Sequence, residues 1–255
     1  LPPFLTAGCA LLIGSLVALP WSGFQWRLAI VPAQTLALGI YGLFGYHFLL
    51  FLAFRTAPAV QANLVNYLWP LLIVVLAPLF HKNSRLHLRQ VLAAMAGLTG
   101  AVLVMTNGQA IATDFNLGYL AALASAFIWA TYSLMTQRVA AFHTAAIGYF
   151  GFVSGILALI CHFLLETPVA LSINDAGLLT WMGLGPLGLA FYFWDAALKN
   201  GNAQHIGLLS FLTPLCSTLL LLIGRQEALT SLVAWAGGLI VGGAWLGRPQ
   251  NTNEA

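Results

Sequence analysis

Polar and ring-bearing residues recur at helical spacing in the segment 58–80. The positions i, i+3, i+4 and i+7 are occupied by Asn63, Asn66, Tyr67 and Pro70, so a helix places them on one face. Exposing an asparagine to lipid is costly, and both amides are therefore expected to point into the protein or into a wet cavity. Bonding between helices and lining of a cavity remain open for each amide alone. The face as a whole favours a cavity that holds a ligand.

A second face of this kind lies in the segment 117–137. Ser125, Trp129 and Tyr132 are spaced i, i+4 and i+7, which again is one side of a helix. Trp69, in the first segment, adds another ring. Rings together with a few hydrogen-bonding groups suit a ligand that is itself part ring and part polar.

The third group is Tyr46 with His47, in the segment 33–54. A histidine inside a membrane helix either relays protons or packs as a satisfied core residue, and the sequence leaves both open. The counterpart of His47 in the repeat described below is Phe191, which lies close to Trp194. This region is therefore aromatic in both halves of the chain, and these residues are candidates for contact with a ligand.

Two prolines are expected to interrupt helices near the middle of their spans. The ring of a proline clashes with the carbonyl four residues earlier, which belongs to Asn66 for Pro70 and to Ser210 for Pro214. The predicted kinks leave weakly satisfied carbonyls beside polar side chains. Such a place suits either the binding of a ligand amine or bending, so Ser210 joins the candidate contacts and the prolines are candidate hinges.

The remaining chemistry is sparse. No paired carboxylates, metal-ligand set or phosphate-binding loop occurs in the apolar segments, so the sequence predicts no catalytic residues, no metal and no cofactor. No basic stripe points to nucleic acid. Asp195 and Lys199 stand four residues apart near the end of a helix, where a mutual ion pair is expected rather than a proton site.

The charges show which elements position these side chains. Hydrophobic residues make up 60% of the 255 positions and charged residues 6%, and the charges divide the chain into nine apolar stretches. A helix needs about 20 apolar residues to cross a bilayer, so each stretch predicts one membrane-spanning helix. The fold class is an all-α polytopic membrane protein. The expected spans are 4–20, 33–54, 58–80, 88–106, 117–137, 142–165, 177–198, 203–223 and 231–247.

An internal repeat organises these spans. An offset of 144 residues lays 51–80 on 195–224 and pairs Pro70 with Pro214. We infer a ten-helix bundle of two five-helix repeats, with helices 2–5 in 1–110, helices 6–10 in 111–255, and the first helix outside the given sequence. Seven of the nine Lys and Arg residues then fall on the cytoplasmic side, as does the C-terminus. An odd number of helices per repeat inverts the second repeat, which is typical of secondary transporters with a site near the midplane.

Three stretches resemble a known family. The run Ala126–Arg138 resembles the helix that opens the second repeat of the drug/metabolite transporter superfamily, EamA type, and the segments 53–71 and 197–215 resemble its paired helix joints. Gly45-Tyr46-His47 and Asn66-Tyr67-Leu68-Trp69-Pro70 look more closely like the YddG-type exporters of bacterial inner membranes. That resemblance implies export of aromatic and other neutral amino acids through a central cavity, whose lining it places at Tyr46, His47, Tyr67, Trp69 and Trp129.

The sequence therefore predicts a multi-pass carrier in a bacterial inner membrane. Its expected partners are a small-molecule substrate, namely a neutral or aromatic amino acid, and the lipid bilayer. A monomer is compatible with the sequence, which does not fix the oligomeric state. A carrier of the same fold for lipophilic drugs or other metabolites is the first alternative, and an intramembrane enzyme is the second. Because no acid other than Asp195 lies within a span, we expect facilitated movement without obligatory proton exchange.

Overall fold

The computed structural model describes residues 1–81, 85–109 and 116–248, and these residues form helices and connecting turns without any strand. Eight helices of this part are long and apolar enough to cross a membrane, and a ninth apolar helix, Ser231–Leu246, is shorter. The predicted all-α polytopic fold is confirmed. The eight are Pro3–Trp21, Ala33–Thr56, Ala59–Phe80, Leu88–Thr106, Gly118–Met135, Ala146–Leu165, Ile173–Asn200 and Ala203–Arg225.

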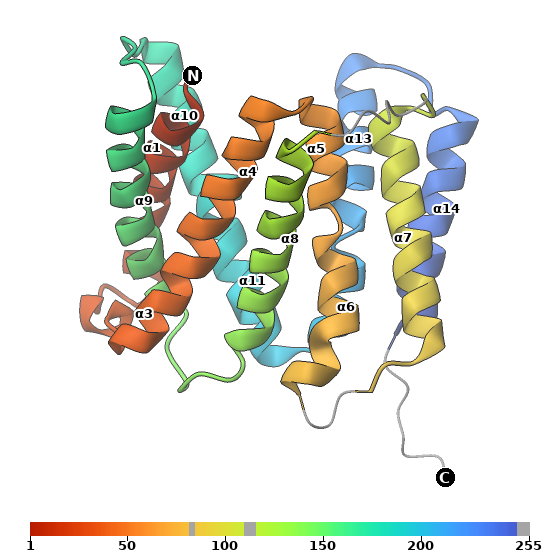
Figure 1. The fold of residues 1–255 in the computed structure, drawn as a ribbon, viewed down its shortest axis with the longest axis horizontal. Helices are drawn as coiled ribbons and strands as arrows, with labels where there is room; N and C mark the ends of the chain where they lie inside the picture. Colours follow the sequence, from red (N-terminus) through yellow and green to blue (C-terminus); the bar gives the residue numbers. More distant parts are fainter. Residues whose placement is uncertain (82–84, 110–115, 249–255) are drawn as a thin grey trace. The chain divides into compact units, whose positions relative to one another are not determined.

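Several spans are built from shorter helices and turns (Figure 1). In chain order these are α1 (Pro3–Ser15), α2 (Ala18–Trp21), η1 (Trp26–Ala29), α3 (Ala33–Ile40), η2 (Tyr41–Gly45), α4 (Tyr46–Thr56), α5 (Ala59–Asn66), α6 (Trp69–Phe80), α7 (Leu88–Thr106), α8 (Gly118–Met135), α9 (Ala146–Leu165), α10 (Ile173–Leu184), η3 (Gly185–Leu189), α11 (Ala190–Asn200), α12 (Ala203–Leu209), α13 (Leu212–Arg225) and α14 (Ser231–Leu246). The turn η1 is a 3-10 helix, whereas η2 and η3 are π-helical turns.

Two predicted boundaries were wrong by four residues. The span expected to begin at residue 142 begins at Ala146. The span expected to begin at residue 177 begins at Ile173. Its start is a capping box, in which the Ser172 hydroxyl accepts from the Asp175 backbone N–H at 3.2 Å and the Asp175 carboxylate accepts from the Ser172 backbone N–H at 2.9 Å. A carboxylate in the first helical turn is favourable. Asp175 therefore marks a helix start, where the charge pattern had suggested a loop.

The chain forms two compact units. Unit 1 comprises residues 1–52 and 135–200, and unit 2 comprises residues 53–134 and 201–255. Each unit thus takes residues from both halves of the sequence. The division into repeats at residue 110 is a statement about sequence and stays a prediction.

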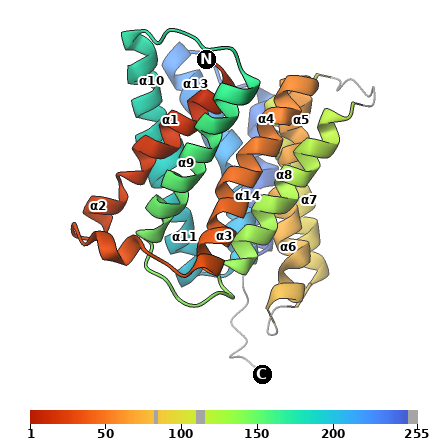
Figure 2. The same cartoon turned by 60° about the vertical axis from the view of Figure 1, so that its left-hand side comes forward.

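Helix α1 packs against α9 and α10 in unit 1 (Figures 1 and 2). Glycines make the close approach: a Cβ atom on Gly14 would lie 2.8 Å from the carbonyl oxygen of Gly183 and 2.9 Å from the Cα atom of Gly188. Any larger residue at Gly14 would force its side chain against the backbone of Gly183 and Gly188. Small residues serve packing in membrane helices in this way.

The two π-helical turns of unit 1 occupy matching places in the repeat. Adding 144 to the bounds of η2 gives those of η3, and adding 144 to the bounds of α4 gives those of α11. The turn η2 contacts α9, and η3 contacts α1. Both turns contain two glycines, and each turn interrupts the α-helical hydrogen-bond pattern.

A carboxylate stabilises the start of α1. Glu166, directly after α9, accepts hydrogen bonds from the backbone N–H groups of Phe4 and Leu5 at 3.0 and 3.2 Å. His162 Nδ1 lies 2.8 Å from the same carboxylate. The Glu166 side chain is only 5% exposed. It therefore supplies acceptors to two N–H groups that have no partner within their own helix.

We expect Glu166→Ala to lower the free energy of unfolding by about 1–3 kcal/mol, because it leaves these buried N–H groups without an acceptor. Glu166→Gln keeps one acceptor oxygen and should lose less. Thermal unfolding in detergent measures both. Glu227→Ala makes the same change at an exposed carboxylate and serves as the control; equal losses in the Glu166 and Glu227 variants would contradict the assignment.

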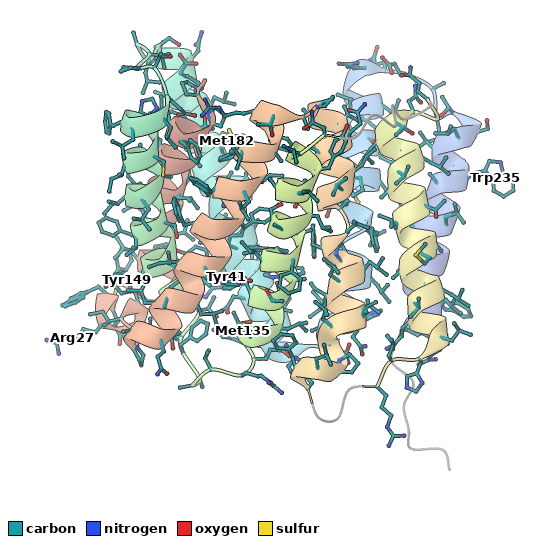
Figure 3. All side chains as sticks on the ribbon, in the orientation of Figure 1. Arg27, Tyr41, Met135, Tyr149, Met182 and Trp235 are labelled. Carbon is teal, nitrogen blue, oxygen red and sulfur yellow. The ribbon has the colours of Figure 1, made fainter. Side chains whose placement is uncertain are left out.

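Helices α7 and α14 lie side by side in unit 2. A Cβ atom on Gly100 would lie 2.7 Å from the carbonyl oxygen of Ala236, so the two backbones nearly touch. On its other side, α14 carries Trp235, which is 76% exposed and projects away from α7 in Figure 3. An exposed indole on an apolar helix is expected where the helix faces lipid.

A buried glutamine compensates for a proline inside α6. Pro78 has no N–H to donate to the carbonyl of Val74, four residues earlier. Gln204 of α12 supplies the missing donor: its Nε2 donates to the Val74 oxygen at 3.1 Å. Gln90 of α7 in turn donates to Gln204 Oε1 at 3.3 Å. Three helices of unit 2 are thus joined at the position where one of them lacks a backbone hydrogen bond.

This arrangement predicts a specific rescue. Gln204→Leu should cost about 1–3 kcal/mol of stability, because it removes the donor to Val74 and the acceptor of Gln90. Pro78→Ala restores the backbone N–H, so the same glutamine substitution should cost less in that background. A double-mutant cycle of melting temperatures in detergent tests the coupling. Identical losses in both backgrounds would show that Gln204 does not serve the proline.

Candidate functional site

Both candidate hinge prolines lie at interruptions of spanning helices in unit 2. The span 59–80 changes from α5 to α6 at Tyr67–Leu68, and the span 203–225 changes from α12 to α13 at Ser210–Phe211. Pro70 is the second residue of α6, and Pro214 is the third residue of α13. The breaks confirm that the prolines interrupt these helices; their role as hinges stays a prediction.

The carbonyl of Ser210, which loses its usual donor to Pro214, was expected to be weakly satisfied. It has a hydrogen bond instead. The oxygen of Ser210 accepts the backbone N–H of Thr213 at 3.1 Å in a tight turn, and the Ser210 hydroxyl donates to the Ile206 carbonyl at 2.9 Å. The chain has tightened to a three-residue hydrogen bond, as helix ends commonly do. Ser210 therefore uses its own groups to form the break, and ligand contact there is an untested prediction.

The polar face of α5 is joined to the face predicted on α8. Asn66 is 3% exposed, and its Oδ1 accepts the hydroxyl of Ser125 at 2.9 Å. The same hydroxyl lies 2.7 Å from the carbonyl of Ala122. Asn66 is the last residue of α5, so this contact attaches the end of the half-helix to α8. Asn63, one turn earlier, is half-buried.

Three rings gather in unit 2 around Trp129. Its ring centroid lies 6.5 Å from that of Trp69 in an edge-to-face arrangement, and 5.4 Å from that of Tyr132. Trp129 and Tyr132 are buried, whereas Trp69 is half-buried. Trp69 begins α6, immediately beyond the break, and Trp129 lies one turn from Ser125 on α8. We call Trp69, Trp129 and Tyr132 the ring cluster.

Tyr67 stands at the break itself and is half-buried, packed against the apolar core formed by α6, α7, α12, α13 and α14. Its place beside Trp69 in the chain puts a phenol and an indole at the same interruption. The break thus presents ring-bearing residues where the backbone is irregular. This is the place where membrane carriers commonly hold a ligand.

His47 has a fixed hydrogen-bonding role in unit 1. Its Nδ1 lies 2.6 Å from the carbonyl oxygen of Leu43, which belongs to the π-helical turn η2. A carbonyl can only accept, so Nδ1 carries the proton and Nε2 of the neutral ring is an acceptor. The ring is buried and lies edge-on to Phe191 of α11 at 5.9 Å. The two repeat partners, His47 and Phe191, thus meet.

The other unit 1 candidates lie near this pair. Tyr46 is half-buried, with its ring centroid 5.1 Å from that of His47. Trp194 follows Phe191 by three residues on α11 and is also half-buried. The sequence repeat matched Tyr46 and His47 with the aromatic stretch that contains Phe191 and Trp194. In the structure, α4 and α11 meet at the contact of His47 with Phe191. Contact of these residues with a ligand remains a prediction.

Two polar arrangements were not singled out from the sequence. Gln90 and Gln204 form the junction that serves Pro78, and His162 with Glu166 serves the start of α1. A glutamine within an apolar stretch was the available signal for the first. The expected pair of Asp195 with Lys199 is present, with Lys199 Nζ 2.5 Å from Asp195 Oδ2. In the part of the chain that the structure describes, no three His, Cys, Asp or Glu side chains gather as metal ligands would.

Many spanning helices, two of them broken beside a proline and one of those breaks flanked by rings, are features of membrane transporters. More specifically, the chain belongs to the EamA-like transporter family, whose model matches residues 1–106 and 116–247. This membership indicates a transporter rather than an enzyme, and a small molecule as its substrate.

Relatives with assigned names support export. The chain is 38% identical over 249 residues to the "Aromatic amino acid exporter YddG" of Ancylobacter novellus, covering 95% of this chain and 86% of that protein. It is 28% identical to the exporter of the same name from Salmonella typhimurium and 29% identical to that from Escherichia coli, covering 64% and 66% of those proteins. The chain also resembles a protein of known crystal structure, with 37% sequence identity and a TM-score of 0.88. The match covers 97% of this chain and 88% of the chain in that crystal structure.

Proposed function

We propose that this protein exports aromatic and other neutral amino acids from the bacterial cytoplasm, through a cavity reached alternately from the two sides of the inner membrane. The ring cluster beside the break at Tyr67–Leu68 is the observation that carries this proposal. Offset and edge-to-face contacts between aromatic rings are favourable beyond the area they bury. An aromatic side chain of the substrate can join the ring cluster through Trp69, which is only half-buried.

The polar ends of the substrate need hydrogen-bonding partners. His47 offers an acceptor at Nε2, because Nδ1 is held by the Leu43 carbonyl. Such an acceptor suits an ammonium group or an indole N–H. A neutral amino acid carries no net charge, so it needs no permanent counter-charge in the cavity. The candidates for substrate contact are Tyr46, His47, Phe191 and Trp194 in unit 1 and Asn63, Asn66, Tyr67, Trp69, Ser125, Trp129, Tyr132 and Ser210 in unit 2. Their contact with the substrate is our proposal, made for each unit by itself.

The interruptions supply the movement in this proposal. A helix broken at mid-span can change the direction of one half without rebuilding the other. The breaks stand at equivalent places in the repeat, and inversion of the repeats would set them to act from opposite sides of the membrane. The same inversion, with the bias of Lys and Arg, puts the C-terminus in the cytoplasm.

Counterflow in proteoliposomes tests this function. Vesicles loaded with unlabelled phenylalanine should take up labelled phenylalanine transiently, and tryptophan or leucine inside should also drive uptake. A lipophilic dye that drives uptake where amino acids do not would favour the alternative cargo. With equal phenylalanine on both sides, an imposed pH gradient should produce no accumulation, because we expect facilitated movement. Sustained accumulation would show that proton coupling exists.

A further inference from the structure

Two buried carboxylates of unit 1, Glu166 and Asp195, differ in how completely they are hydrogen-bonded. In the pair of His162 and Glu166, one carboxylate oxygen accepts from Phe4 and the other from Leu5 and His162. In the pair of Asp195 and Lys199, Oδ2 accepts from the lysine at 2.5 Å, but Oδ1 is buried without a donor among the described residues. Asp195 is 2% exposed. A buried charged oxygen without a donor is uncommon and calls for an explanation.

Lys199 has a hydrogen-bond donor to spare. An ammonium carries three N–H donors. One goes to Asp195 Oδ2, and a second goes to the Thr144 hydroxyl at 3.2 Å. These two bonds leave a third donor on a side chain that is 30% exposed, and Nζ also lies 3.9 Å from the centre of the Phe142 ring. One spare acceptor, one spare cationic donor and one aromatic ring therefore belong to one cluster.

These three groups complement an aromatic amino acid. The substrate ammonium can donate to Asp195 Oδ1, and the substrate carboxylate can accept from Lys199, without breaking the existing pair. Charge-assisted bonds of this kind are roughly twice as strong as neutral ones. We propose that Asp195 and Lys199, with Phe142, bind the zwitterionic head group of the substrate; this rests on the proposed function.

The position of the cluster indicates the step of transport at which it binds the substrate. Thr144 and Phe142 belong to the non-helical segment 136–145, and the Gln137 amide bonds the Leu198 carbonyl of α11. The segment is therefore held against the end of α11 beside the pair. It must move to admit a ligand to Asp195. By the Lys and Arg bias this end of α11 faces the cytoplasm, so the cluster is an entry site, and it shares no residue with the ring cluster.

Competition by analogues tests the site. Binding of labelled phenylalanine to the purified full chain is competed with phenylalanine, with 3-phenylpropionate, which lacks the ammonium, and with phenethylamine, which lacks the carboxylate. Asp195→Asn should reduce the preference for phenylalanine over 3-phenylpropionate by about tenfold or more. Lys199→Gln should reduce the preference over phenethylamine similarly, and because this lysine is partly exposed the variant remains informative should Asp195→Asn fold poorly.

Glu166→Gln is the matched control, because that carboxylate is fully bonded; both preferences should stay at the wild-type values. A merely structural pair would change melting temperature and leave the preferences unaltered, so unchanged preferences in the Lys199 variant overturn the site even if Asp195→Asn fails to fold. That result leaves the proposed function intact. Wild-type protein that binds no phenylalanine overturns both.

Discussion

Replacing Trp129 by alanine is expected to reduce phenylalanine transport by about tenfold or more, since contacts between aromatic rings are favourable beyond the area that they bury. Trp129 contacts both Trp69 and Tyr132 and is 7% exposed. Its loss removes the ring that contacts both of the others. Initial rates of counterflow, normalised to the protein recovered in the vesicles, measure the effect.

The control must separate transport from folding. Trp235→Ala removes the same side chain from a lipid-facing position and should leave transport unchanged. Trp129→Phe keeps an aromatic ring with less volume lost, and should retain part of the rate if ring contact is the cause. A Trp129→Ala protein that transports at the wild-type rate would contradict the assignment of the ring cluster to the substrate.

The second large effect is expected for the hinge prolines. Pro70→Ala restores a backbone N–H that can donate to the Asn66 carbonyl, and so favours one continuous helix across the break. We expect turnover to fall by about tenfold while phenylalanine affinity changes little, because motion rather than contact is lost. Pro214→Ala should act in the same way on the other span. Parallel measurement of dissociation constants and counterflow rates distinguishes the two quantities.

Pro78→Ala provides a matched control within the same helix. This proline also lacks an N–H, but Gln204 already satisfies the carbonyl concerned. Its substitution should leave turnover near the wild-type rate. If the Pro70 and Pro214 variants lose affinity with unchanged turnover, the prolines shape the binding site and are not hinges.

The spans could be predicted from the sequence because charged side chains are largely excluded from the bilayer. Two spans accordingly end one residue after Arg55 and Lys199. The breaks were also predictable, since the effect of proline is local. Partners far apart in the chain were not. Asn66 and Ser125 were each recognised on separate helices, yet no spacing rule joins an amide to a hydroxyl 59 residues away.

The same limit applies to backbone partners. That Gln204 serves Val74 depends on how α12 lies on α6, and a carbonyl has no signature in the sequence. The acceptor role of His47 likewise depends on the π-helical turn that presents Leu43. Glycines marked that stretch, but a single π-helical turn shifts the periodicity too little to be read from residue types. Direct contact of substrate with any of these side chains is still a prediction.

The matched π-helical turns also bear on the predicted repeat. A π-helical turn holds one residue more than the α-helical turn it replaces, and such turns are rare. The turns η2 and η3, and the helices α4 and α11 that follow them, share one offset of 144 residues. If the two halves are copies of one ancestral half, we expect that half to have carried the extra residue already. The irregular helix would then be older than the two-repeat chain that contains it.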